Sequence, residues 1–278
     1  MSPIRTLPLA VTALLVSSHA LADDLRIATT VSAGATWIHH TRASNNPVPF
    51  TERGTLAATS IVVQLDAPTS WFARLQLDLA QGTTDLHGEV VRGTAVDEKT
   101  RNLFLSPELD LGGRFDIDPD LYLVEYCGIG YRHWRRDIQA DGAAHWDRSW
   151  AAIAIGTMLE ARVAPRTRLV IDAALVPAFL AKVNLTGIVY QNTPQDDVSL
   201  SPQGKLGFRA RIAVTHDLGA HARIGLLAGY DYVAFGVSAL TTPRPVQLPD
   251  GSSGLYATME PAASTHQVSG QATVSLSF

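Results

Sequence analysis

The chain has 278 residues, of which 46% are hydrophobic and 17% charged, and its formal net charge is −4. A length in this range suits one exported or soluble domain, and the mild acidity excludes the basic face that a nucleic-acid-binding protein needs. Cys127 is the single cysteine, so an intramolecular disulfide is excluded as a source of stability.

The first 22 residues predict a signal peptide. Arg5 supplies a positive start, an apolar run extends from Leu7 to Val16, and Ala20-Leu21-Ala22 forms a small-x-small cleavage site. The run is too short to cross a bilayer as a helix, and no cysteine follows the cleavage site to accept a lipid. We therefore expect residues 1–22 to be removed and residues 23–278 to form one exported domain, one charge more negative than the whole chain.

Apolar and polar residues alternate with a period of two along most of the mature chain. The last segment shows this clearly, since apolar or small residues alternate with polar ones from Gln267 to Phe278. Strands direct successive side chains to opposite faces, so each such segment has one apolar and one polar face. The pattern predicts ten strands, near residues 25–38, 54–66, 70–81, 101–115, 120–134, 148–163, 167–177, 203–215, 221–235 and 265–278.

The connections between these segments alternate in length. Turn-forming clusters join the strands at 66–69, 116–119, 164–166 and 216–219, whereas the segments 39–53, 82–100, 135–147, 178–202 and 236–264 are long and rich in loop residues. Short turns on one side and long loops on the other are typical of outer-membrane barrels, whose strands also need ~9–11 residues. We predict an all-β, antiparallel, up-and-down transmembrane barrel of about ten strands (range 8–12), with short periplasmic turns and long external loops.

Aromatic residues gather near both ends of the predicted strands, as expected for girdles at the two membrane boundaries. Those near the periplasmic ends are Trp71, Phe72, Phe115, Tyr122 and Phe278, and those near the outer ends are Trp37, Trp134, Trp146, Trp150, Tyr230, Tyr232 and Phe235.

The final segment resembles the C-terminal strand of bacterial outer-membrane proteins, which commonly ends in Phe after alternating apolar residues. The resemblance implies the outer membrane of a Gram-negative-type bacterium, contact with its lipid and lipopolysaccharide, and recognition by the barrel-assembly machinery through Phe278. Ten strands are also similar to the omptin-like architecture of proteases and adhesins, at the level of shape.

Two positions disturb the regular pattern. Glu125 shares a face with Cys127 and Ile129, so we expect a bulge near Glu125 or Tyr126 to turn this carboxylate away from lipid. Pro107 has no backbone N–H to donate to a ladder, so regular pairing is expected to begin at or after it.

Charges of both signs recur on the polar faces, and we expect them to form ion pairs inside the barrel, because a confined charge without a partner is costly. The hairpins would bring Arg74 near Asp110 and Lys205 opposite Asp231. The alternative is that these charges line a narrow conducting path; ten strands leave no room for a general pore.

Enzyme chemistry has only weak candidates. The resemblance to omptin-like proteases implies a pair of aspartates and an Asp-His pair on the outer rims. The candidate residues in this sequence are Asp85-Leu86-His87 and Asp196-Asp197. Ser264-Thr265-His266 is the nearest arrangement for a lipid-modifying hydrolase, but it lacks an acidic orienter. His39-His40 makes a poor metal site, because neighbouring strand residues point to opposite faces.

We therefore expect no catalytic, cofactor-binding or metal-binding residues and no nucleic-acid partner. The leading functional prediction is a non-enzymatic barrel whose external loops bind a ligand or shield the surface. A narrow channel is the second prediction and an outer-membrane protease or lipid-modifying enzyme the third. A soluble periplasmic barrel with a small apolar ligand is the competing structural class.

Overall fold

The computed structural model describes residues 26–43, 50–66, 70–90, 94–139, 145–187, 189–190, 193–194, 196–242, 244–247, 253–256 and 258–278. The predicted signal peptide lies outside these residues. The described part contains no helix long and apolar enough to cross a membrane. Its regular elements are strands: β1 Arg26–Arg42, β2 Phe50–Asp66, β3 Trp71–Val90, β4 Thr94–Asp118, β5 Leu121–Ile138, β6 His145–Ala164, β7 Thr167–Leu175, β8 Ala178–Thr186, β9 Val189–Tyr190, β10 Thr193–Pro194, β11 Val198–Leu200, β12 Phe208–Asp217, β13 Ala222–Phe235, β14 Arg244–Gln247, β15 Ser253–Tyr256 and β16 Ala263–Ser277.

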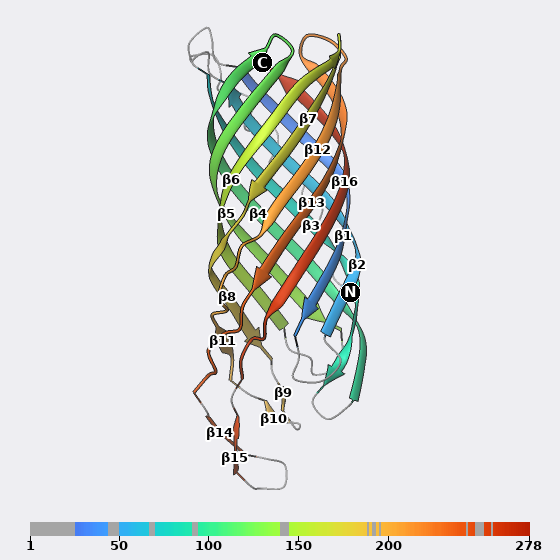
Figure 1. Cartoon of the computed structure of the whole chain (residues 1–278). Coiled ribbons are helices and arrows are strands. Elements are labelled where there is room, and N and C mark those ends of the chain that lie inside the picture. Colours follow the sequence, from blue (N-terminus) through green and yellow to red (C-terminus); the bar gives the residue numbers. More distant parts are fainter. Residues whose placement is uncertain are drawn as a thin grey trace.

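The long strands close into an antiparallel barrel (Figure 1). Each strand from β1 to β7 pairs with the next, β7 pairs with β12, and the sheet continues through β13 and β16. Closure comes from β16 and β1, which pair from Ala28 with Ser277 to Arg42 with Ala263. Among the described strands the ladder runs without a gap around the membrane-spanning part of the barrel, which is the condition for a sheet to span a bilayer. The predicted fold class and strand count are confirmed.

Two of the ten barrel strands are interrupted in the middle. β7 and β8 follow one line along β6, because Leu175 opposite Ile155 and Ala178 opposite Ala152 share one register. Pro177, which separates them, cannot donate a backbone hydrogen bond. The neighbouring strand is likewise divided into β11 and β12, with Val176 and Gly207 hydrogen-bonded to each other across the break. The barrel therefore continues past this break toward the end that carries the long connections, which we call the loop end. The opposite end, with the short turns, is the turn end.

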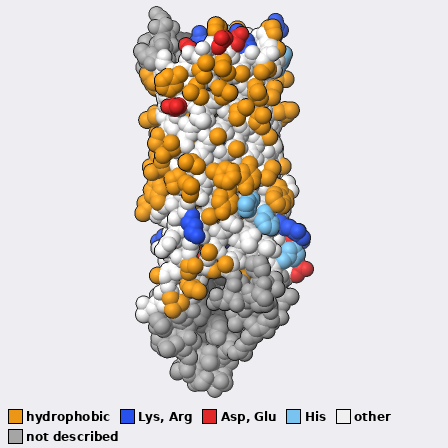
Figure 2. All heavy atoms as spheres, viewed as in Figure 1, with side chains coloured by type: hydrophobic (Ala, Val, Ile, Leu, Met, Phe, Trp, Pro, Cys, Tyr) orange, Lys and Arg blue, Asp and Glu red, His pale blue; other side chains and the backbone are white. Residues whose placement is uncertain are grey.

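The outer surface carries a broad apolar band below the charged rim of the turn end (Figure 2). Side chains such as Leu111, Ile155 and Leu226 are more than half exposed there. On β1 the band runs from Ile27 to Trp37, which matches the ~9–11 residues of a membrane-spanning strand. The alternation seen in the sequence thus places the apolar face outside and the polar face in the lumen.

The aromatic girdles are smaller than predicted. Side chains that face outward at the two boundaries are Trp71, Phe115 and Phe278 at the turn end, and Trp37, Phe208, Tyr230 and Tyr232 at the loop end. Phe72, Trp134, Trp150 and Phe235 are buried inside instead. The prediction placed these four residues correctly along their strands, but they lie on the face of each strand that points into the lumen.

The long segments contain more pairing than the sequence predicted. Segment 178–202 holds β8 to β11, segment 236–264 holds β14 and β15, and the hairpin of β3 and β4 extends through most of 82–100. β8 and β11 still have one covered face, because alternate side chains such as Val183, Leu185 and Leu200 are buried. The strands therefore continue beyond the parts that cross the membrane.

The two expected irregularities are absent. β5 pairs without a register shift past Glu125 on both neighbours, so no bulge forms and the carboxylate stays on the outer face. Regular pairing does not begin at Pro107: β4 pairs with β3 from Thr94 onward, and Pro107 lies opposite Leu77 in that ladder. On the β5 side the ladder omits Ser106 and Pro107 and then resumes in the same register, so the proline interrupts pairing locally.

One of the two predicted cross-strand ion pairs is wrong. Asp231 lies opposite Arg209, not Lys205. The turn between β12 and β13 is centred later than expected, with the Leu218 N–H bonded to the Ala222 carbonyl, and this moves the partner by four residues. The other prediction is confirmed, since Arg74 Nε donates to Asp110 at 2.8 Å.

Candidate functional site in the barrel lumen

The turn-end half of the lumen is a cavity of about 1320 Å³. Arg26, His221 and Phe278 line it at the turn end, and Phe104 and Trp150 line it at the opposite end. This cavity therefore lies at the end of the barrel that carries the short turns.

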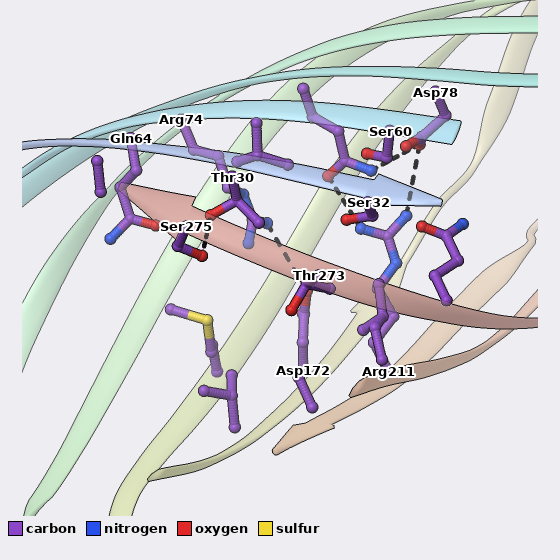
Figure 3. Close-up of a pocket in the computed structure, with 18 of the residues that line it drawn as sticks. Thr30, Ser32, Ser60, Gln64, Arg74, Asp78, Asp172, Arg211, Thr273 and Ser275 are labelled. Atoms are coloured by element: carbon purple, nitrogen blue, oxygen red, sulfur yellow. Dashed lines mark hydrogen bonds and ion pairs between the residues drawn. The ribbon is translucent and has the colours of Figure 1, made fainter. Parts of the chain in front are cut away.

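One wall of the cavity is neutral and polar. It is formed by inward-facing Ser, Thr and Gln side chains of β16, β1 and β2 that alternate with outward apolar residues. Figure 3 shows Thr30 and Ser275 meeting across the boundary between β1 and β16, and their hydroxyl oxygens are 2.7 Å apart. The neutral wall consists of Thr30, Ser32, Thr36, Ser60, Gln64, Thr265, Gln267, Ser269, Gln271, Thr273, Ser275 and Ser277.

The opposite wall is a network of ion pairs. Glu108 accepts hydrogen bonds from Arg209 at 2.6 Å and from Arg132 at 2.9 Å. Arg74 binds Asp110 and lies 3.7 Å from Asp172. In Figure 3 Arg211 reaches Asp78, with 3.7 Å between their charged groups. Each of these charges has an opposite partner, as expected for ionised groups held away from bulk water.

An aromatic plug closes the lumen toward the loop end. Trp134 and Phe104 stack with ring centroids 4.6 Å apart, and Trp150 meets Phe235 edge-on at 5.2 Å. Ile38 and Leu56 pack into the same cluster with no exposed surface. The Trp134 indole N–H donates to Asn102 at 2.6 Å, which satisfies the buried polar group of the ring. We call this set the aromatic plug: Ile38, Leu56, Phe104, Trp134, Trp150 and Phe235.

A second ionic cluster lies beyond the plug. Glu52 is fully buried and accepts hydrogen bonds from Asn102, Thr84 and Arg136. Glu260 accepts one from Arg148 and has Arg42 at 3.9 Å. Arg42 also lies over the ring of Trp146, 4.2 Å from its centroid. This outer ionic cluster leaves a space of only about 30 Å³, room for about one water molecule.

The protease candidates do not come together as a catalytic site. On β3, Asp85 and His87 alternate with the inward Leu86 and therefore face outward. Asp85 accepts a hydrogen bond from Lys99 at 2.7 Å, which lowers the pKa of its carboxyl group, and His87 lies 3.0 Å from Asp97. Each side chain is thus paired within one exposed hairpin. Asp196 and Asp197 precede β11 and are exposed.

The hydrolase candidates share a face but lack the required partners. Ser264 and His266 alternate with the buried Thr265 on β16 and so point outward, near the loop-end girdle. The Nδ1 atom of His266 is 2.7 Å from the hydroxyl of Tyr230, and the ring packs against Tyr232. In the described part of the chain no carboxylate orients this histidine, so no catalytic triad is formed.

The adjacent histidines point in opposite directions, as predicted. His40 is buried and bonded to the Thr265 hydroxyl at 2.9 Å, whereas His39 lies on the outer face beside Trp37. Among the residues that the structure describes, no group of three or more His, Cys, Asp or Glu side chains is placed to hold a metal ion.

The sequence prediction missed the aromatic plug. Three of its members, Trp134, Trp150 and Phe235, were assigned to the outer girdle from their distance to the strand ends, and that distance is nearly the same for a girdle and for a plug. The alternation of strand positions could have revealed the plug. Phe104, Trp134 and Trp150 lie an even number of residues from the charged inward residues Glu108, Arg132 and Arg148 on their strands, so their rings also point inward.

The closed barrel, its apolar exterior and its polar lumen define the fold of the outer-membrane β-barrel proteins. No family model and no curated protein matches the chain. Among solved structures, the outer membrane protease OmpT from Escherichia coli has the same fold over 94% of this chain and 100% of its own, with a TM-score of 0.61 and 11% identity. At that identity the likeness concerns the fold alone.

Two further structures match with lower scores. The translocator domain of the autotransporter NalP from Neisseria meningitidis covers 93% of this chain and 90% of its own, at 14% identity and a TM-score of 0.42. The outer membrane protein OprG from Pseudomonas aeruginosa covers 92% and 96%, at 10% identity and a TM-score of 0.41.

Proposed function

We propose that this protein is a non-conducting barrel of the outer membrane of a Gram-negative-type bacterium, which presents a binding or shielding surface at its loop end. The observation that carries the proposal is the aromatic plug together with the outer ionic cluster. These side chains are buried and in contact across the barrel, which supports a lumen that is closed to ions.

The loop end supports the second half of the proposal. β8, β11, β14 and β15 extend beyond the apolar band, and the hairpin of β3 and β4 is also longer than a membrane crossing requires (Figure 1). Elements that extend from a rigid scaffold are where barrels commonly carry recognition, because they tolerate variation that the scaffold does not.

Planar bilayer recording tests the closed state. Refolded wild-type protein is expected to give no conductance steps, whereas a Phe104→Ala/Trp134→Ala double variant removes the stacked pair and should admit ions. The matched control is Trp37→Ala, which removes an outward ring and should stay closed. Steady conductance of the wild-type protein would exclude the proposal and favour the narrow channel.

Epitope insertion tests the orientation. A tag between Gln247 and Ser253 should be stained on intact cells, and a tag in the turn at Pro119 and Asp120 only after the outer membrane is opened. The reverse staining would contradict the assignment of loop end and turn end. N-terminal sequencing of the membrane fraction should begin at Asp23 if residues 1–22 act as the proposed signal peptide.

The proposed partners follow from this location. Phe278 ends the closing ladder through two backbone hydrogen bonds with Ile27, and we propose that this terminal strand is recognised by the barrel-assembly machinery. Exposed cations beyond the apolar band, among them Arg53, Arg101 and Lys182, are suited to the phosphates of lipopolysaccharide. Slow assembly of a Phe278→Ala variant in cells would support the first partner.

The enzyme alternatives have less support. Asp85 and His87 are paired with other side chains on an exposed hairpin, and His266 is bonded to a tyrosine. Proteolysis or lipid hydrolysis by purified protein that disappears in Asp85→Asn or Ser264→Ala variants would reverse this ranking.

A further inference from the structure

We propose that the turn-end cavity is a binding site for a neutral oligosaccharide that enters from the periplasmic side. This site is independent of the loop-end function proposed above. It rests on four features of the cavity: its neutral wall, its nearly balanced charge, its aromatic floor and its size.

The neutral wall offers free hydrogen-bonding groups. Within the described part of the chain, the side chains of Ser32, Ser60, Ser269 and Thr273 make no hydrogen bond to another protein group. Hydroxyl and amide groups both donate and accept, so they match the hydroxyls of a sugar. Because β16 and β1 are adjacent, the neutral wall is continuous along the cavity.

The opposite wall excludes a strongly charged ligand. Eight arginines and six carboxylates line the cavity. Glu108, Asp110, Asp120 and Asp217 pair with lining arginines, and Arg209 pairs with Glu108, which gives nine arginines and ten carboxylates. With the charges nearly balanced, an anion or a cation would have to displace an existing pair, whereas a neutral hydroxylated molecule can form hydrogen bonds without breaking one.

The floor and the volume suit several sugar rings. Phe104 and Trp150 close the inner end of the cavity, where an aromatic ring can pack against the apolar face of a sugar. The volume of about 1320 Å³ exceeds the ~300–1,000 Å³ typical of small-molecule sites. A chain of two to four rings that lies along the barrel axis fits this space better than a single sugar.

Isothermal titration with chitotriose, a neutral N-acetylated trisaccharide, tests the proposal. The mature protein is refolded in a zwitterionic detergent without a sugar headgroup, because alkyl glycosides would compete. Saturable binding with a Kd of about 1 mM or tighter is expected. Inorganic phosphate should not compete, and competition by phosphate would overturn the neutral-ligand assignment.

A pair of variants locates the site. Ser60→Leu/Thr273→Leu fills the neutral wall and is expected to weaken chitotriose binding at least tenfold. Ala272→Leu, one residue from Thr273 but on the outer face, should bind like the wild type. Heat-modifiable gel migration confirms that both variants fold. Absence of binding by the wild-type protein, or equal binding by the filled and control variants, would overturn the proposal.

Discussion

The two halves of the lumen are built from the same alternating strands but are filled in different ways. Toward the loop end, large rings and buried ion pairs meet across the barrel, and a space of only about 30 Å³ lies beside Arg42 and Glu52. Toward the turn end, the neutral wall carries uncharged Ser, Thr and Gln side chains, and a cavity of about 1320 Å³ remains. The alternation along each strand therefore determines which side chains point into the lumen. The size of those side chains determines whether the lumen is filled or leaves a cavity.

Truncation of a plug residue should show the largest difference between the two halves. Trp134→Ala removes a stacked ring and leaves Asn102 without its donor, so we expect a loss of about 3–5 kcal/mol in the free energy of unfolding. Gln271→Ala in the hollow half should change it by no more than about 0.5 kcal/mol. Urea unfolding in lipid vesicles measures both, and similar losses would contradict the contrast.

Ion pairs provide the second test. Glu52→Ala leaves the buried Arg136 without its counter-charge and should cost about 3–5 kcal/mol. Glu160 in the hollow half pairs with Arg168 at 2.9 Å, but both remain partly exposed to the cavity, so Glu160→Ala should cost about 1 kcal/mol or less. Urea unfolding in lipid vesicles measures both losses. An equal loss of unfolding free energy in the two variants would mean that the cavity excludes water as fully as the plug does.

Two neighbouring residues on β16 test the division between lipid and lumen. Ala272 faces outward, and an arginine there would meet acyl chains, at a cost of about 2–4 kcal/mol near the middle of the bilayer. Gln271 lines the cavity, so Gln271→Arg should fold almost as well as the wild type. The yield of heat-modifiable protein in vesicles compares them, and the opposite order would exchange the inner and outer faces.

The smallest expected effect concerns the seam at which the barrel closes. A Cβ atom at Gly34 would lie 2.0 Å from the backbone oxygen of Gly270, so Gly34→Ala must displace the backbone and should cost about 1–3 kcal/mol. At Gly270 an added Cβ would have no atom within 4 Å, so Gly270→Ala should be neutral or slightly stabilising. Equal stability of the two variants would argue against this close approach.

The sequence was sufficient for the barrel itself, because alternation and turn chemistry are local properties. The ion pair of Arg74 and Asp110 was also predictable, because both side chains lie on the polar faces of two strands that are consecutive in the chain and pair in one ladder. The pair of Lys205 and Asp231 was predicted wrongly, because the centre of their turn was misjudged. β8 and the β14–β15 hairpin were missed because the segments 178–202 and 236–264 were assigned to loops from their content of loop-forming residues, although β8 buries alternate side chains.

The cavity and the plug were not predictable in the same way. Both depend on which inward side chains meet across the lumen, and strands that are distant in sequence provide them. Trp134 of β5 and Phe104 of β4 are neighbours in one ladder, but Ile38 of β1 and Phe235 of β13 join the same cluster only because the barrel closes. The alternation along a strand shows that these rings point inward, but it does not show which side chains from other strands they contact.

The hydrogen bond between Thr30 and Ser275 joins residues 245 positions apart. The first and last strands are ladder partners, so an unfinished chain has two unsatisfied edges and cannot take up its final shape in lipid. Such long-range contacts make assembly slow, and the exported polypeptide must remain unaggregated until its final strand arrives. A chaperone that holds the unfolded chain during this delay should therefore affect its yield more than its stability once assembled.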